Sequence, residues 1–283
     1  MSLVVVQTGL LSLVQDSGRP GLGHLGVSTS GAFDRVALRQ VNAVLGNAAD
    51  AAVIEAIGGG LALRATEAHV VAVTGAAGPV TIDGRQAAYG RALRLAAGQQ
   101  LELGTAVTGL RTYVAVAGGL DVGRELGSAA TDTLAGLGPP PLAVGDELPT
   151  GRPSALPEVD DVPPLGIAGD MTLDVVLGPR DDWFEPDAMR RLLDEPWQVS
   201  GASDRVGVRL TGPTLDRSRA GELPSEPCVR GSVQVAADGQ PIVFGPDHPV
   251  TGGYPVIAVV VDAHTDRLAQ ARPGQVIRFR RRP

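Results

Sequence analysis

The feature that most constrains the fold of this chain is a motif that occurs twice. Residues 30–39 read Ser-Gly-Ala-Phe-Asp-Arg-Val-Ala-Leu-Arg, and residues 200–209 read Ser-Gly-Ala-Ser-Asp-Arg-Val-Gly-Val-Arg. Weaker matches at the same spacing of about 170 residues relate residues 3–81 to residues 173–251. This period is far longer than that of a solenoid repeat, which is roughly 20–50 residues. The repeat therefore predicts two tandem copies of one domain.

A proline-rich stretch lies between the two predicted copies. It contains Pro153, Pro157, Pro163 and Pro164, a composition typical of a linker. We therefore expect an N-terminal domain over residues 1–150, a linker over residues 151–169 and a C-terminal domain over residues 170–283. A chain of 283 residues is long enough to bury two separate cores.

The composition excludes several classes of function. A net charge of −7 and an aromatic content of 3% argue against a nucleic-acid or anionic-membrane surface, which needs many basic or stacking side chains. The single cysteine allows no internal disulfide. No apolar run approaches the ~18 residues of a membrane span, so we expect a cytoplasmic protein.

The hydrophobic pattern indicates mainly β-structure. Short apolar runs separated by glycine-containing turns recur from residue 53 to residue 148, and again from residue 229 to the end, which favours barrels or sandwiches. A helix is predicted after the first motif, with Gly31 as N-cap, Asp34 in the first turn and Gly46 at the end. A second helix is expected to start at Pro186. After the second motif, residues 206–210 alternate with period two and predict a strand.

Arginine supplies every fixed positive charge of the chain, because all 24 Lys and Arg residues are arginines. The chain therefore has no lysine for a P-loop, a Schiff base or biotin attachment. HExxH, GxSxG and paired Cys/His motifs are also missing from the sequence, so no metal site is predicted. Of the four histidines, His69 is expected to be structural, whereas His24 and His248 lie in loops and are weak functional candidates.

Carboxylates recur beside arginines in the glycine-rich loops, and a guanidinium can bind a carboxylate or phosphate through two hydrogen bonds. Such pairs can bind a small polar anion, or they can serve only to stabilise their own turns. The pairs are Asp16 with Arg19, Asp34 with Arg35, Asp204 with Arg205, and Glu226 with Arg230.

Several longer segments resemble one known family. They are Gln-Asp-Ser-Gly-Arg-Pro-Gly at residues 15–21, the first motif with Gly26-Val27 before it, Gly46-Asn47, residues 111–119 and 203–210, and Thr-Gly-Gly-Tyr-Pro at residues 251–255. Together they are similar to the family of the 5-oxoprolinase C subunit, also called KipA or allophanate hydrolase subunit 2. A domain of the same kind forms half of the carboxyltransferase region of urea carboxylase.

The resemblance implies a fold and an activity. The expected fold is mainly β, with two tandem cyclophilin-like β-barrel domains related by internal duplication and a few short helices. The expected function is ATP-dependent cleavage of 5-oxoproline to glutamate, together with a KipI-like B subunit plus a LamB/YcsF-like A subunit. ATP, with Mg²⁺, is the expected co-substrate, and no cofactor is expected to be bound covalently. The alternatives are a carboxyltransferase half of the allophanate hydrolase or urea carboxylase type, and a non-catalytic antagonist of a KipI-like protein.

The matched motif positions carry most of the candidate site residues, and Glu55 and Glu226 join them because each lies a few residues before a glycine and a strand. Arg19 or Arg205 is expected to bind an anion, and Asp34 or Glu226 the ring N–H of the substrate. The predicted catalytic residues are Asp34, Asp204, Arg205 and Glu226, and the predicted substrate-binding residues are Asp16, Arg19, Ser30, Glu55, Gln240, Thr251, Gly253 and Tyr254.

The chain departs from the family pattern in three places. Residues 127–131 read Gly-Ser-Ala-Ala-Thr where an arginine is usual, residues 139–142 read Pro-Pro-Pro-Leu where Gly-Arg-x-Leu is usual, and Pro227 replaces a glycine. If either missing arginine binds an anion in relatives, substrate handling differs here. The choice among 5-oxoproline, allophanate and urea therefore stays open from the sequence.

Overall fold

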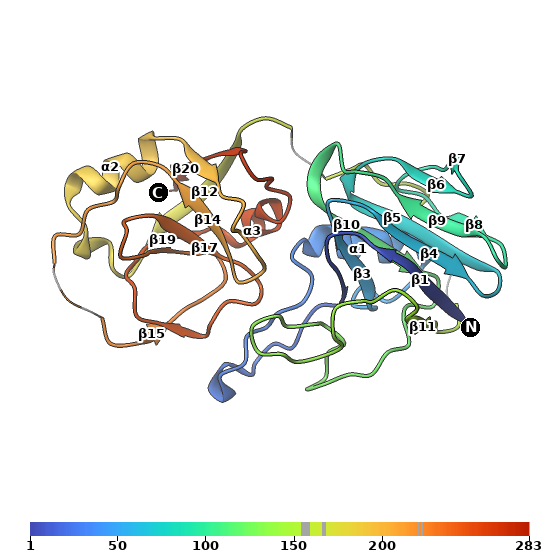
Figure 1. The fold of residues 1–283 in the computed structure, drawn as a ribbon. Helices are drawn as coiled ribbons and strands as arrows, with labels where there is room; N and C mark the ends of the chain where they lie inside the picture. The colour runs from blue at the N-terminus through green and yellow to red at the C-terminus, as the bar shows by residue number, and fades with distance from the viewer. Residues whose placement is uncertain (154–158, 166–167, 220, 222, 283) are drawn as a thin grey trace. The chain divides into compact units, whose positions relative to one another are not determined.

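The computed structural model describes residues 1–153, 159–165, 168–219, 221 and 223–282. The chain divides into two compact units (Figure 1). The first comprises Met1–Arg19, Ser30–Asp132 and Gly136–Gly166, and the second comprises Pro20–Thr29, Thr133–Ala135 and Ile167–Pro283. The division falls within the stretch 151–169, and two short loops from the first half of the chain are part of the second unit.

Two antiparallel sheets form the first unit. The first sheet has the strand order β11-β1-β4-β9-β6-β7, and the second has the order β2-β3-β10-β5-β8. The strands are β1 Ser2–Thr8, β2 Ser12–Gln15, β3 Val53–Ile57, β4 Leu61–Ala65, β5 His69–Ala77, β6 Val80–Ile82, β7 Arg85–Gln86, β8 Leu93–Leu95, β9 Gln100–Leu103, β10 Thr108–Val116 and β11 Glu147–Pro149.

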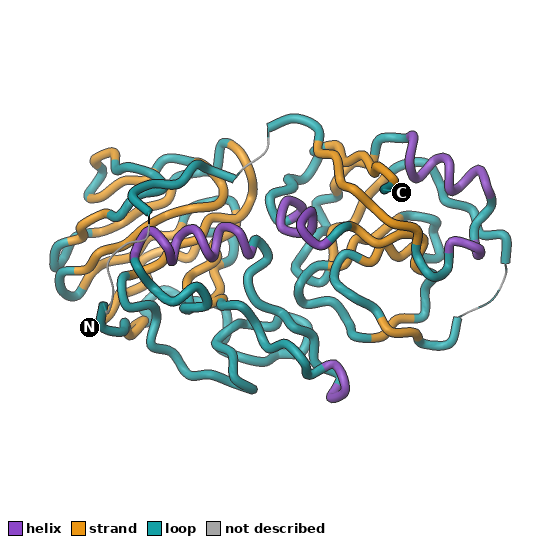
Figure 2. Tube along the Cα trace, turned by 180° about the vertical axis from the view of Figure 1, so that it is seen from behind, coloured by secondary structure: helices purple, strands orange, loops and turns teal. Residues whose placement is uncertain are grey.

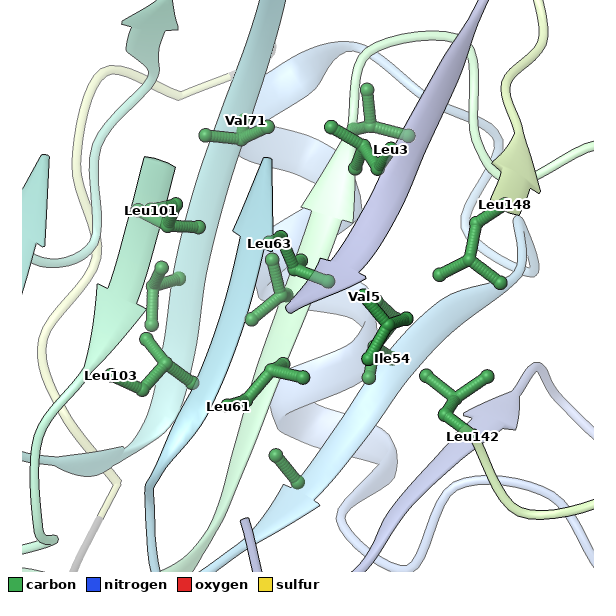
Figure 3. Close-up of a cluster of buried hydrophobic side chains, with 14 of the residues drawn as sticks. Leu3, Val5, Ile54, Leu61, Leu63, Val71, Leu101, Leu103, Leu142 and Leu148 are labelled. Atoms are coloured by element: carbon green, nitrogen blue, oxygen red, sulfur yellow. The ribbon is translucent and has the colours of Figure 1, made fainter. Parts of the chain in front are cut away.

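The main core of this unit lies between its two sheets. Leu3 and Val5 of β1, and Leu63 of β4, pack toward the second sheet, where Ile54 and Val71 are buried (Figure 3). Their alternation along each strand follows from the two-residue period of β-structure. The prediction of mainly β-structure is confirmed, although the first unit consists of two packed sheets and only the second is a closed barrel.

Helix α1, Arg35–Leu45, covers the opposite face of the second sheet (Figure 2). Ala37, Val41 and Val44 line its buried side, as the apolar spacing predicts. Its C-cap is Gly46, which has a φ of 65°. The predicted N-cap, Gly31, is wrong. The N-cap is Asp34, because its Oδ1 accepts hydrogen bonds from the free N–H groups of Val36 and Ala37.

The second unit is built around a closed barrel with the strand order β12-β19-β16-β17-β14-β13-β20, beside a two-stranded ribbon of β15 and β18. Helix α2 spans Pro186–Asp194, as predicted, whereas α3, Asp262–Leu268, lies where the sequence pattern predicted only β-structure. The strands are β12 Met171–Leu177, β13 Trp197–Val199, β14 Gly207–Thr211, β15 Glu226–Pro227, β16 Ser232–Val235, β17 Pro241–Phe244, β18 Thr251–Gly252, β19 Val256–Val260 and β20 Val276–Arg281.

The two copies of the motif form the same turn. Asp204 Oδ1 accepts hydrogen bonds from the N–H groups of Val206 and Gly207, as Asp34 Oδ1 does from residues two and three positions ahead. The first copy then continues as α1 and the second as β14. A Cβ at Gly207 would lie 2.6 Å from Cγ2 of Ile242 on the neighbouring strand, so a larger residue here would crowd that side chain.

No helix in the described part of the chain is long and apolar enough to cross a membrane.

Candidate functional site

The predicted site residues fall into two groups, one in each unit. Asp16, Arg19, Ser30, Asp34 and Glu55 lie in the first unit, and all five are buried. The second unit holds Asp204, Arg205, Glu226, Gln240, Thr251, Gly253 and Tyr254.

In the first unit, the motif backbone runs along a series of buried polar partners. Ala32 donates its N–H to Asp16 O at 2.9 Å, and Phe33 donates its N–H to Glu55 Oε2 at 2.9 Å. Asp34 donates its N–H to the Tyr113 hydroxyl at 2.7 Å. The motif therefore joins the loop that follows β2 to side chains of β3 and β10.

Glu55 and Tyr113 form the centre of this series. They are directly opposite in the pairing of β3 with β10, and the Tyr113 hydroxyl donates to Glu55 Oε2 at 2.7 Å. Arg111, two residues before Tyr113 and so on the same face of β10, places Nε 3.5 Å from Glu55 Oε1 and stacks over Phe33 at 4.2 Å. Glu55 is 1% exposed, and the bonds that it makes in this structure hold the motif in place.

Tyr113 is fixed as a hydrogen-bond donor. Burial raises the pKa of Tyr113 well above its ordinary value, and the negative charges of Glu55 and Asp34 raise it further. Burial also raises the pKa of Tyr89, again with help from Asp34, and its hydroxyl donates to Gly75 O at 2.8 Å. Both phenols stay protonated at physiological pH, so neither serves as a base in this arrangement.

Asp16 organises the loop that contains residues 125–131. Its Oδ1 accepts hydrogen bonds from Gly18 N at 2.7 Å and Ser128 Oγ at 2.6 Å. Its Oδ2 accepts from Ala129 N at 2.7 Å and lies 3.5 Å from Arg124 Nη1. Asp16 therefore bonds to Arg124 and the loop backbone, and the sequence neighbour Arg19 is not its ion-pair partner.

Arg19 bonds to carbonyl groups of the same loop. Its Nη2 donates to Ala130 O at 2.5 Å and its Nε to Glu125 O at 3.4 Å. Next to it, Gln15 Nε2 donates to Thr131 O at 2.8 Å, and Ser30 Oγ donates to the same carbonyl at 3.4 Å. Gln15, Arg111 and Tyr113 were not selected from the sequence, although all three lie within the segments that carry the family resemblance.

In the second unit, Arg205 forms a buried bidentate pair with Asp247. Its Nε and Nη2 donate to the two carboxylate oxygens at 2.8 and 2.9 Å, and both residues are 1% exposed or less. Asp247 Oδ2 also accepts from Thr133, through its N–H at 2.9 Å and its hydroxyl at 2.8 Å. Asp247 was missed from the sequence, since nothing in its spacing indicates the pairing. Asp204 is exposed and caps its own turn.

Glu226 pairs with Arg180 and not with its sequence neighbour Arg230, which contacts Asp266. The hydrogen bond from Arg180 lowers the pKa of Glu226, although partial burial opposes this effect. The Cys228 thiol lies nearby, and burial followed by the charge of Glu226 raises its pKa. The thiol is therefore protonated and a poor nucleophile.

The remaining predicted residues of this unit lie at its surface. The Gln240 side chain accepts a hydrogen bond from the N–H of Gly212 and donates one to its carbonyl. It also lines a cavity of about 160 Å³. Thr251, Gly253 and Tyr254 are exposed, and the Arg217 guanidinium lies 5.6 Å from the Tyr254 ring centre. Contact of any of these residues with a substrate stays a prediction.

Comparisons with known proteins show which family the chain belongs to. The model of the family "Carboxyltransferase domain, subdomain A and B" matches residues 25–281. Two bacterial proteins, each named as the C subunit of 5-oxoprolinase, are 36% identical to it: the Escherichia coli protein over 98% of this chain and 90% of its own length, and the Haemophilus influenzae protein over 94% and 86%.

A solved structure, the K. lactis urea amidolyase, matches 98% of this chain with a TM-score of 0.92 and 27% identity. The matched region is only 18% of that longer chain. Because the family model spans nearly the whole sequence and the two bacterial relatives match it almost end to end, the chain belongs to the carboxyltransferase domain family, subdomains A and B.

Proposed function

We propose that this chain is the C-type subunit of a 5-oxoprolinase, a complex that opens 5-oxoproline to glutamate while ATP is hydrolysed to ADP and phosphate. The observation that supports the proposal is the 36% identity to the Escherichia coli 5-oxoprolinase C subunit over 98% of this chain and 90% of that protein. By contrast, the Saccharomyces cerevisiae urea amidolyase is matched over 16% of its length.

The proposed reaction breaks the C–N bond of a cyclic amide. A five-membered lactam is a stable amide, and transfer of a phosphoryl group to its oxygen makes the ring carbon electrophilic and creates a leaving group. Water then adds to that carbon, and the C–N bond breaks as the ring nitrogen takes up a proton, which leaves an acyl phosphate. A second water attacks the acyl carbon, and phosphate leaves with the former lactam oxygen. Such a site needs cations around the transferring phosphoryl group and a partner for the substrate carboxylate.

We propose that two partner subunits, one KipI-like and one LamB/YcsF-like, complete the enzyme in the cytoplasm. This chain has no lysine, and its buried Arg111 and Arg205 are paired with carboxylates. Within the described residues, no cluster of three His, Cys, Asp or Glu side chains could hold a metal ion. Arg111 and Arg205 therefore do not supply a free charge for ATP phosphates, and we propose that the nucleotide and Mg²⁺ bind on a partner.

A second candidate is carboxyl transfer. The name of the matching family model and the TM-score of 0.92 to the K. lactis urea amidolyase favour it. Because this chain has no lysine, carboxybiotin would have to arrive on another protein.

The test is reconstitution from purified subunits. Mixed with the two partner subunits, 5-oxoproline and ATP, the chain is expected to raise glutamate release at least about tenfold over the mixture that lacks it. Omission of ATP should abolish the release. An equal rate without this chain would contradict the proposal.

A further inference from the structure

Three arginines are almost fully buried in the part of the chain that the structure describes, and one of them has no carboxylate partner there. Arg111 lies beside Glu55, and Arg205 is held by Asp247. Arg19 is 2% exposed, but its hydrogen bonds go only to the backbone carbonyls of residues 125 and 130. Its Nη1 has no hydrogen-bond partner among the described residues. A buried cation without a counter-charge is costly, so this guanidinium is suited to meet an anion that enters from outside.

Gln15 supplies a buried acceptor that is anchored to the same loop as Arg19. It is 0% exposed, and its Nε2 donates to Thr131 O at 2.8 Å. Since a carbonyl can only accept, this bond fixes the orientation of the amide and leaves Oε1 as the second atom. Oε1, too, is buried and has no partner in the part of the chain that the structure describes. Gln15 and Arg19 are thus anchored to the carbonyls of two consecutive residues, Thr131 and Ala130.

A cavity in the first unit lies at the loop to which Arg19 is anchored. Its volume is about 290 Å³, and Arg124, Glu125 and Gly138 are among its lining residues. Glu125 belongs to both features, because its carbonyl accepts from Arg19 Nε. Arg124 is half exposed, and its Nη1 lies 3.5 Å from Asp16 Oδ2, so that carboxylate partly offsets its charge. A small anion therefore has space next to the loop that Arg19 holds.

We propose that Arg19 binds the carboxylate of 5-oxoproline and that Gln15 Oε1 accepts its ring N–H. In this molecule the carboxylate is attached to the carbon next to the ring nitrogen, so a donor and an acceptor anchored to the same loop match it. The assignment rests on the proposed function. Of the two arginines predicted to bind the anion, this assignment chooses Arg19. The ring N–H is assigned to Gln15, because Asp34 caps α1 and Glu226 pairs with Arg180.

The test uses two ligands that differ only in the carboxylate. In the reconstituted complex, Arg19→Gln should raise the KM for 5-oxoproline about tenfold or more, as expected for loss of a charged hydrogen bond. It should change the inhibition constant of 2-pyrrolidinone, the same lactam without the carboxylate, by less than about twofold. Gln15→Leu should raise the KM for 5-oxoproline and the inhibition constant of 2-pyrrolidinone by similar factors, because both molecules carry the ring N–H.

Arg91→Gln is the matched control, since Arg91 is 60% exposed and pairs with Asp161 at the surface. It should leave both constants unchanged. Both constants are ratios that do not depend on the fraction of folded enzyme, so partial unfolding of a variant does not imitate the result. An unchanged KM in Arg19→Gln, in a complex that releases glutamate, would overturn the assignment while the proposed function stands.

If the wild-type complex releases no glutamate, the proposed function fails and thermal unfolding of the full chain tests the site. A rise in Tm with 5-oxoproline that disappears in Arg19→Gln supports the site. No rise, or a rise with inorganic phosphate only, contradicts it.

Discussion

Gly31 of the first motif has a backbone conformation and a close contact that favour glycine. Its φ is +82°, in the left-handed region that favours glycine, and a Cβ there would lie 2.7–2.9 Å from backbone atoms of residues 16–18. The close approach lets the motif bond to the loop that carries Asp16 and Arg19. The equivalent Gly201 in the second copy has an ordinary φ, and a Cβ added there would have no neighbouring atom within 4 Å. The structure therefore constrains the first glycine to be a glycine, whereas it does not constrain the second in this way.

Gly31→Ala should lower the free energy of unfolding by about 2–3 kcal/mol, because the new methyl group meets backbone that cannot move aside cheaply. Gly201→Ala is the matched control and should cost less than about 0.5 kcal/mol. Urea unfolding of the two variants measures both values. Equal losses in the two variants would show that the backbone at Gly31 is not constrained in this way.

At the scale of elements, a carboxylate joins two parallel strands of the barrel. Asp174 of β12 is opposite Arg280 of β20, and Nε of Arg280 donates to its Oδ1 at 2.7 Å. Arg282 donates to its Oδ2 at 2.8 Å. Burial raises the pKa of Asp174, but the hydrogen bonds from Arg282 and Arg280 outweigh burial and hold it below its ordinary value of 3.8.

This pKa direction predicts a pH dependence of stability. The folded state binds the Asp174 proton more weakly than the unfolded state, so the stabilisation is fully present above pH 3.8 and is lost as the pH falls through the lower folded pKa. Asp174→Asn should therefore unfold more easily than the wild type at pH 7. The difference should shrink as the pH falls below 3.8, measured by urea unfolding across this range. A difference that stays constant with pH would contradict this account.

The elements also show what could be predicted from sequence. The short apolar runs between residues 53 and 148 correspond to strands such as β3, β6 and β8, since turn residues separate such runs. Helix α3 was missed because seven residues with a single leucine give no helical periodicity. The helix cap was misplaced because Gly31 and Asp34 are both good caps, and only the hydrogen bonds of Asp34 decide between them.

The partners of the charged residues could not be read from spacing. Arg205 follows Asp204 directly but bonds to Asp247, and Glu226 is bonded to Arg180. Such pairs form where the topology brings distant loops together, and local sequence carries no sign of this. The sequence therefore predicted several of the residue types at the site, whereas the pairing that leaves Arg19 without a carboxylate came only from the structure.

For the whole molecule, the central claim is that this chain takes part in an ATP-driven opening of a lactam. Phosphorylation of the lactam oxygen predicts that this oxygen ends up in the released phosphate. Carboxyl transfer instead starts from bicarbonate, whose oxygen would enter phosphate. The two candidate functions therefore differ in the origin of one oxygen atom.

The most direct measurement is the transfer of ¹⁸O from the ring carbonyl of labelled 5-oxoproline to inorganic phosphate in the reconstituted complex. The account predicts about one labelled oxygen for each phosphate released, and no labelled phosphate when this chain is omitted. Unlabelled phosphate in the complete mixture, or label that reaches phosphate only from ¹⁸O-bicarbonate, would contradict it.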